Sequence, residues 1–252
     1  MNKILIITEG TKPDKKIVEH LIKVYKQRDV KYEIETYNTN IYKLYQEMKK
    51  IYNDLDEVQI IPILKKEKHD FKFNKEDFTD IYLFFDYDIQ HYEYNRDTSP
   101  DNLNTQLEEM LNYFNDSTGY AGKLYINYPM VEVFFQTSLS LIEISSLNNY
   151  KEISTINKHK GRFIQNSDYF DLIMINSIFE NHIVRENFLV NEKEEIPNYS
   201  IYKKIDQIEI FRKQLEKYVN ISNRIFELSC FSRFIIEYFG EEIYNCYFVK
   251  TS

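Results

Sequence analysis

A chain of 252 residues, 43% of them hydrophobic, is long enough to bury a substantial core. The net charge of −8 argues against a large nucleic-acid footprint, because phosphates are contacted mainly by Lys and Arg. The longest apolar runs fall far short of the ~20 residues that a membrane helix needs, and no signal-peptide pattern opens the chain. We therefore expect a globular cytoplasmic protein that does not enter a membrane.

The first half of the chain alternates short apolar runs with amphipathic helical patterns. The runs predict strands at Lys3–Thr8, Tyr32–Tyr37, Val58–Leu64, Ile81–Phe85 and Leu124–Tyr128. The helical patterns follow Gly10, with apolar residues from Ile17 to Tyr25 on one face, and span Ile41–Tyr52 and Leu103–Phe114. This alternation predicts an α/β fold with a mostly parallel sheet flanked by helices on both faces.

Beyond residue 130 the pattern is typical of helices. We expect them at Val131–Leu147, Phe170–His182 and Tyr202–Phe239, the last broken near Asn220, with an exposed linker at Glu186–Ser200. The organisation predicted is an α/β domain over residues 1–140 and an α-helical C-terminal region over residues 141–252, packed on the domain or binding a partner. The cysteines, Cys230 and Cys246, lie in aromatic helical stretches and are expected to be buried free thiols.

Carboxylates follow two of the expected strands. Ile-Ile-Thr-Glu-Gly closes the first strand at Glu9, and Phe-Phe-Asp-Tyr-Asp closes a later one at Asp86 and Asp88. Because the carboxyl ends of parallel strands share one edge of a sheet, these side chains are expected to face a common site. Clustered carboxylates repel unless a cation joins them, and hard oxygen ligands favour Mg²⁺ or Mn²⁺. Solvated carboxylates in capped loops are the alternative interpretation.

Basic residues in two segments could contact phosphate. Lys12 and Lys16 flank the start of the first helix, where Gly10 allows a tight turn. The segment Asn157–Arg162 carries Lys158, Lys160 and Arg162 around a glycine. It is either a nucleic-acid grip or an ordinary basic loop. Nearby side chains offer further candidates, each with a bland alternative: His91 as a proton donor, and Tyr87, Tyr92 and Tyr94 as stacking platforms.

The two acidic motifs resemble the signatures of the Toprim domain, found in topoisomerases, bacterial primases, small RNA-processing nucleases and OLD-family nucleases. A third segment, Leu124–Phe135, resembles the Asn-Pro-Xaa-Xaa-Glu element of RloB-like Toprim proteins from phage-defence loci, through Asn127, Pro129 and Glu132. The similarity covers roughly residues 3–140. Two departures are the missing Gly after Asp-Xaa-Asp, where Ile89 to His91 stand, and an Asn-Tyr-Pro spacing that is one residue longer.

The resemblance implies Glu9 as general base or metal ligand, Asp86 and Asp88 as metal ligands, and Glu132 as a further acidic ligand. It also implies a Mg²⁺- or Mn²⁺-dependent nuclease acting on DNA or RNA, including tRNA, as an antiphage abortive-infection effector. Topoisomerase and primase activities need further domains that this sequence does not contain. No Walker A pattern occurs, so the chain is not expected to be an ATPase itself. Because OLD-like Toprim proteins often work with an ATPase, the resemblance implies a separately encoded ATPase partner.

Two other functions fit parts of the pattern. One is a non-catalytic Toprim-fold regulatory subunit that binds a partner through its aromatic C-terminal helices. The other is a glycosyltransferase that uses Asp-Xaa-Asp, which gives Glu9 no role. The oligomeric state stays open, with a homo-oligomer as one option.

Overall fold

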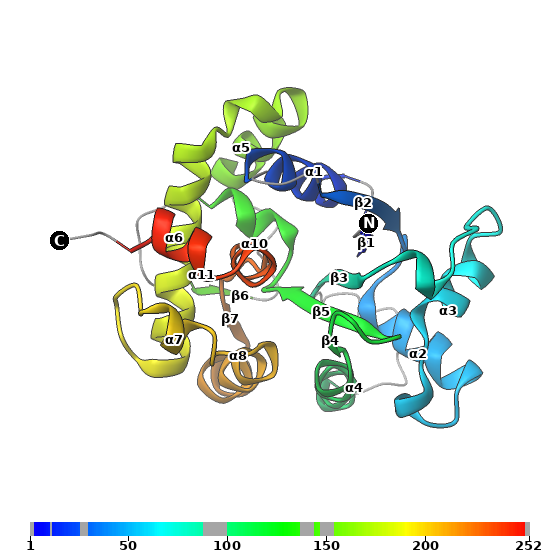
Figure 1. Ribbon diagram of the computed structural model, residues 1–252. Coiled ribbons are helices and arrows are strands. Elements are labelled where there is room, and N and C mark those ends of the chain that lie inside the picture. Colours follow the sequence, from blue (N-terminus) through cyan, green and yellow to red (C-terminus); the bar gives the residue numbers. More distant parts are fainter. Residues whose placement is uncertain are drawn as a thin grey trace. The chain divides into compact units, whose positions relative to one another are not determined.

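The computed structural model describes residues 3–10, 12–25, 30–87, 100–136, 144–146 and 154–249. Its contacts divide the chain into two compact units (Figure 1). Unit 1 comprises Met1–Lys15 and Lys26–Tyr125, and unit 2 comprises Lys16–Tyr25 and Ile126–Ser252. A functional domain boundary near residue 140 stays a prediction.

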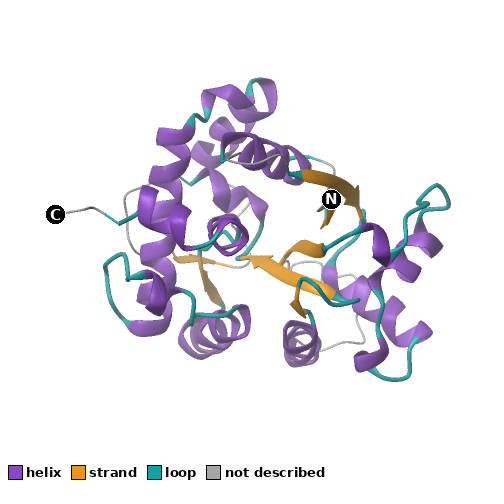
Figure 2. Cartoon of the chain, in the orientation of Figure 1, coloured by secondary structure: helices purple, strands orange, loops and turns teal. Residues whose placement is uncertain are grey.

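Unit 1 is built on a five-stranded sheet of order β2-β1-β3-β5-β4. The strands are β1 (Lys3–Thr8), β2 (Lys31–Thr36), β3 (Asp80–Asp86), β4 (Asn115–Asp116) and β5 (Gly122–Asn127). The central strand β1 pairs in parallel with both β2 and β3, and its last five residues are fully buried. The short β4 pairs antiparallel with β5. The α/β fold with a mostly parallel sheet is therefore confirmed (Figure 2).

Helices flank this sheet, as predicted. Those of unit 1 are α2 (Ile41–Ile51), α3 (Ile60–Glu67), α4 (Pro100–Tyr113) and the 3-10 turns at Leu55–Glu57 and Lys75–Asp77. Helix α1 (Asp14–Val24) begins in unit 1, and its residues from Lys16 on belong to unit 2. Helix α2 begins at an Asn40 cap, whose side-chain oxygen accepts from the Lys43 N–H. The Tyr45 hydroxyl donates to the Glu109 carboxylate at 2.6 Å, which ties α2 to α4.

The strand predicted at Val58–Leu64 is wrong, because this segment opens helix α3. A short apolar run does not by itself distinguish a buried strand from a buried helix. Pro62 lies in the first turn of α3, where its missing N–H would have no partner within the helix. The apolar residues have the helical i, i+3, i+4 spacing and are buried: Ile60, Ile61, Ile63 and Leu64.

Unit 2 is mainly helical, which confirms the helical C-terminal region. Its helices are α5 (Ser154–Gln165), α6 (Leu172–Asn191), α7 (Tyr199–Tyr202), α8 (Gln207–Gln214), α9 (Asn220–Ser222), α10 (Phe231–Phe239) and α11 (Glu241–Tyr247). Shorter elements are the 3-10 turns Val131–Phe135 and Ser167–Tyr169, the π-helical turn Leu215–Val219, and the strands β6 (Ile144–Ser146) and β7 (Arg224–Phe226).

The helix predicted at Val131–Leu147 is wrong. The helical turn ends at Phe135, and Ile144–Ser146 forms strand β6, which pairs antiparallel with β7. Strand β7 in turn interrupts the helical stretch predicted at Tyr202–Phe239, just after the expected break near Asn220. In these segments the backbone of β6 pairs with that of β7 instead of continuing a helix.

Two other segments of unit 2 differ from expectation. The basic segment Asn157–Arg162, expected as a loop, belongs to helix α5. Phe163 on this helix packs against Phe134 and Phe170, so one face of the helix is buried. The linker predicted at Glu186–Ser200 begins only after α6 ends at Asn191. The polar residues at the start of that range, Glu186 and Asn187, are buried and hydrogen-bonded within the unit. Their polar character therefore wrongly suggested that this segment is exposed.

Neither cysteine is in a disulfide, but only Cys230 is buried as predicted, since Cys246 is exposed. None of the helices in the described ranges is both long and apolar enough to cross a membrane.

Candidate functional site

The carboxyl ends of β1 and β3 bring Glu9 and Asp86 side by side in unit 1. The parallel register pairs Thr8 with Phe84, and the Glu9 N–H donates to the Phe84 carbonyl at 3.0 Å. The Asp86 N–H donates to Glu9 Oε2, also at 3.0 Å. Both acidic residues are half-buried, so both keep some contact with solvent. The third acid of the predicted cluster, Asp88, lies outside the described residues.

The turn after β1 is shaped by a carboxylate that the sequence reasoning missed. Asp14, in the first turn of α1, is buried, and a Cβ placed on Gly10 would lie only 2.9 Å from its Oδ2 atom. The Thr8 hydroxyl donates to the Gly10 carbonyl at 3.0 Å in the same turn. A larger residue at position 10 would therefore have to displace the Asp14 carboxylate. An acid at a helix start is common, so Asp14 did not stand out among the candidate site residues.

The two carboxylates fit the ligand type that Mg²⁺ or Mn²⁺ prefers. Within the described ranges, no group of three or more His, Cys, Asp or Glu residues is placed to hold a metal ion. Mg²⁺ is often held by only one or two carboxylates together with water and substrate phosphates. Glu9 and Asp86 supply such a pair, while one oxygen of Glu9 already accepts a backbone N–H.

The fourth predicted acid, Glu132, forms an ion pair in unit 2. It lies in the turn Val131–Phe135, and the Lys160 ammonium of α5 donates to its Oε1 atom. Both side chains are about one quarter exposed or less. The predicted metal ligand and the predicted phosphate contact thus neutralise each other in this structure.

The remaining predicted basic residues have different environments. Lys16 donates to the Ile164 carbonyl at the end of α5, at 2.7 Å, so it acts as a helix cap there. Lys12 is exposed in unit 1. Lys158 and Arg162 are exposed on α5 in unit 2.

Two residues close to the motifs are structural. The Asn127 Oδ1 atom is buried and accepts from the Cys230 N–H at 3.1 Å, which joins β5 to the start of α10. The Tyr87 ring is fully buried, and its hydroxyl donates to Asn104 Oδ1 at 2.8 Å. Burial also raises the pKa of the Tyr87 hydroxyl. The Tyr87 ring is therefore not available for stacking, in agreement with the alternative that its place beside the motif is due to chance. His91, Tyr92 and Tyr94 lie outside the described residues.

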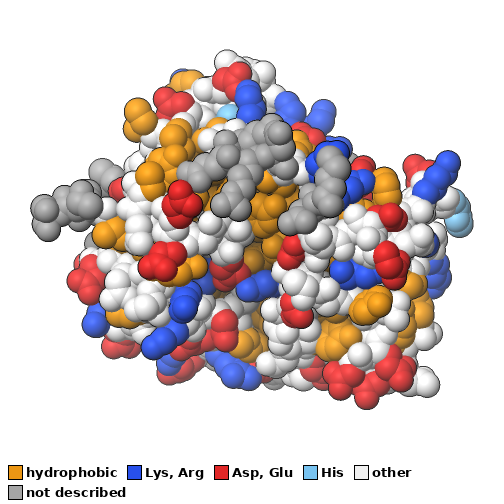
Figure 3. Space-filling view, in the orientation of Figure 1, with side chains coloured by type: hydrophobic (Ala, Val, Ile, Leu, Met, Phe, Trp, Pro, Cys, Tyr) orange, Lys and Arg blue, Asp and Glu red, His pale blue; other side chains and the backbone are white. Residues whose placement is uncertain are grey.

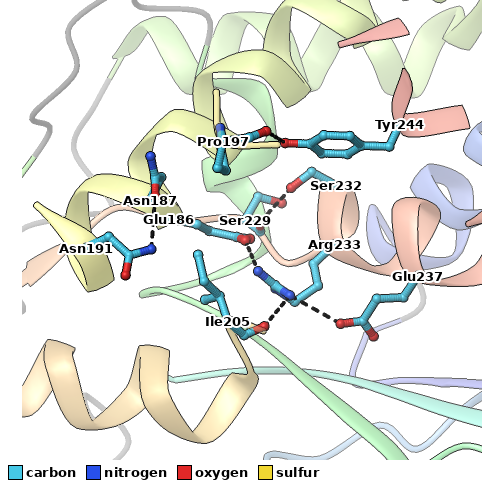
Figure 4. Close-up of polar contacts among 10 residues, drawn as sticks. All are labelled: Glu186, Asn187, Asn191, Pro197, Ile205, Ser229, Ser232, Arg233, Glu237 and Tyr244. Carbon is cyan, nitrogen blue, oxygen red and sulfur yellow. Dashed lines mark hydrogen bonds and ion pairs between the residues drawn. The ribbon is translucent and has the colours of Figure 1, made fainter. Parts of the chain in front are cut away.

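Unit 2 contains a buried charged cluster that sequence reasoning missed (Figure 4). Arg233 on α10 has no exposed surface, and its guanidinium forms an ion pair with Glu186 on α6. It also donates to the Ile205 carbonyl at 2.6 Å and to Glu237 at 3.3 Å. The Tyr202 ring lies 4.5 Å from the guanidinium carbon. Spacing along the chain gave no signal, because Glu186 and Arg233 are 47 residues apart.

No protein-family model, curated protein or solved structure matches this chain. The resemblance to the Toprim domain rests on the three sequence motifs.

Proposed function

We propose that this protein is a Mg²⁺- or Mn²⁺-dependent nuclease of the Toprim type that hydrolyses phosphodiesters in DNA or RNA, including tRNA. The observation that carries the proposal is the pairing of Glu9 and Asp86 at the ends of adjacent parallel strands. This edge of the sheet is where α/β proteins bind ligands. An antiphage setting, a cytoplasmic location and a separately encoded ATPase partner belong to the same proposal.

Glu9 and Asp86 would hold the metal ion, which, when bound, neutralises phosphate charge and lowers the pKa of a coordinated water. The fixed hydrogen bond from the Asp86 N–H orients the Glu9 carboxylate before any ligand arrives. Asp88 is a further ligand by resemblance. The ion pair with Lys160 leaves Glu132 a ligand only if that pair opens.

The test is cleavage of plasmid DNA, single-stranded DNA, total RNA and tRNA by purified protein with Mg²⁺ or Mn²⁺. Glu9→Gln keeps an acceptor for the Asp86 N–H but removes the charge, and Asp86→Asn removes the charge at the second position. We expect both variants to lose cleavage by about 10²-fold or more while retaining the unfolding midpoint of the wild type.

Asp80→Asn is the matched control, because Asp80 lies at the opposite end of β3 and accepts from the Ser117 hydroxyl at 2.8 Å. This variant should retain full cleavage. Metal-dependent cleavage that survives both Glu9→Gln and Asp86→Asn would place the active site elsewhere. An absence of cleavage in every condition, together with an absence of Mn²⁺ binding, would favour the non-catalytic regulatory subunit.

A further inference from the structure

Helix α5 of unit 2 exposes two cations on one face. Lys158 and Arg162 are four residues apart, so their side chains neighbour each other on the helix surface. Both residues are exposed, and in the described part of the chain neither forms an ion pair with a carboxylate. Lys160, which lies between them in the sequence, forms an ion pair with Glu132 instead. The pair Lys158 and Arg162 is therefore the part of this basic segment that remains available to an anion.

An exposed aromatic ring is fixed beside these cations. Tyr169 is 47% exposed, and Arg162 Nη1 donates to its hydroxyl at 3.1 Å. The Arg162 guanidinium carbon lies 5.4 Å from the centroid of the Tyr169 ring. The ring also meets the buried Phe170 edge-on, with centroids 5.6 Å apart. Tyr169 is thus anchored from two sides while about half of its surface faces solvent.

Cations flank His159, and the acids beside Tyr169 already have partners. Burial lowers the pKa of His159, and the neighbouring Arg162 and Lys158 lower it further. The acid next to the ring, Asp168, is paired with Lys23 at 2.8 Å. The other nearby acid, Asp171, uses its carboxylate to cap α6. In the space-filling view, Lys and Arg side chains lie near the top of the molecule, with Asp and Glu side chains among them (Figure 3).

We propose that Lys158, Arg162 and Tyr169 form a binding site for single-stranded nucleic acid, with the cations on phosphates and the ring stacked on an unpaired base. Cations alone would serve any polyanion. An exposed, anchored aromatic ring beside them favours single strands, because bases in a duplex do not offer their faces for stacking. The choice of nucleic acid as the partner rests on the proposed nuclease function.

The experiment measures binding of short fluorescein-labelled oligouridine, oligothymidine and a duplex by anisotropy, with EDTA present so that metal-dependent cleavage cannot interfere. We expect single strands to bind more tightly than the duplex. Tyr169→Ala should weaken single-strand binding roughly ten-fold without changing its salt dependence, because stacking involves no ion release. Tyr169→Phe should retain most of the affinity.

The double variant Lys158→Gln/Arg162→Gln should weaken binding and make the slope of log K against log salt shallower by about 1.4, for two phosphate contacts on a single strand. Lys203→Gln is the matched control, since Lys203 is also exposed beside a tyrosine ring, at 6.0 Å from Tyr199. It should bind like the wild type.

Three outcomes would overturn the site: no single-strand binding, equal binding by Tyr169→Ala and wild type, or binding of anionic vesicles in preference to oligonucleotides. Binding is measured without metal, so its outcome is separable from that of the cleavage assay. A nuclease that is active and insensitive to Tyr169→Ala would keep the proposed function and lose this site.

Discussion

Charged side chains are held in opposite ways in the two units. In unit 1, Glu9 and Asp86 are half-buried at strand ends, and Glu9 accepts the backbone N–H of Asp86. In unit 2, Glu186 and Arg233 have almost no exposed surface and are paired with each other. The first arrangement leaves carboxylate oxygens within reach of solvent ions. The second excludes solvent and surrounds the charges with fixed partners.

The contrast teaches which charges are available for chemistry. Desolvation of a buried ion pair costs several kcal/mol per ion. Close contact between the charges and further hydrogen bonds offset this cost but add little net stability. Arg233 makes such contacts to α6, to α10 and to the segment before α8, so it fixes these elements relative to each other. Burial raises the pKa of the Glu186 carboxyl, while the Arg233 charge opposes this shift. This cluster therefore serves the fold, whereas the strand-end pair is the better candidate for ligand binding.

The largest predicted effect is on stability, from Arg233→Met. Removing the guanidinium leaves Glu186 buried without its ion-pair partner, and we expect the free energy of unfolding to fall by about 3–5 kcal/mol. The double variant Arg233→Met/Glu186→Leu should recover most of this loss, because no unpaired charge remains. Urea unfolding measures both. If the double variant were as unstable as the single one, the hydrogen bond to Ile205 and the ring contact with Tyr202 would dominate instead.

A second predicted effect concerns pH and the buried His182 of unit 2. Burial, and then the nearby Arg185 guanidinium, hold the pKa of His182 well below its ordinary value, so the folded protein keeps it neutral. Its Nδ1 atom accepts from the Ser229 N–H at 3.3 Å. Below the unfolded pKa of about 6.5, only the unfolded chain binds this proton. The contribution of His182 to stability is therefore present at neutral pH and is lost as the pH falls.

Between about pH 7.5 and about pH 5.5, this loss should reach about 1.4 kcal/mol. Urea unfolding of the wild type and of His182→Asn, which keeps an acceptor for the Ser229 N–H, isolates the contribution. The stability of His182→Asn should fall less over the same interval. Equal falls in the two proteins would mean that His182 is charged in the folded state or that it titrates alike in both states.

The sheet of unit 1 was largely predictable because its strands carry a local signal. Continuous apolar runs such as Leu5–Ile7 and Ile81–Phe85 are typical of strands buried on both faces, and the structure confirms them. The run at Val58–Leu64 failed because buried helices and buried strands share that signal when the run is short. Strands β6 and β7, of three residues each, exist through pairing between residues about 80 apart, which no local pattern reveals.

The part of the candidate site that depends on strand order was predictable from the sequence. The pairings between side chains of distant segments were not. The meeting of Glu9 and Asp86 follows from two parallel strand ends. The pairing of Glu132 with Lys160 and the capping by Lys16 depend on tertiary packing around α5. The approach of Asp14 to Gly10 depends on the turn between β1 and α1. The position of a basic residue in the sequence therefore does not show whether its side chain is already bonded to a carboxylate or a carbonyl in the folded protein.

Glu132 lies between the half-buried strand-end carboxylates and the fully buried Glu186–Arg233 pair, because it is ion-paired but partly exposed. Its pair with Lys160 gives the smallest predicted effect. Both side chains keep some solvent contact, so breaking the pair by Lys160→Met should lower the free energy of unfolding by only about 0.5–1 kcal/mol. Glu132→Gln should have a similar effect, and the double variant should show the two losses to be non-additive.

Cleavage assays then show whether the Glu132–Lys160 pair is only structural or also affects metal binding. If the pair is only structural, Glu132→Gln and Lys160→Met should leave cleavage equal to that of the wild type. If Glu132 opens from Lys160 to bind metal, Glu132→Gln alone should abolish cleavage, and Lys160→Met should lower the Mn²⁺ concentration needed for half-maximal activity.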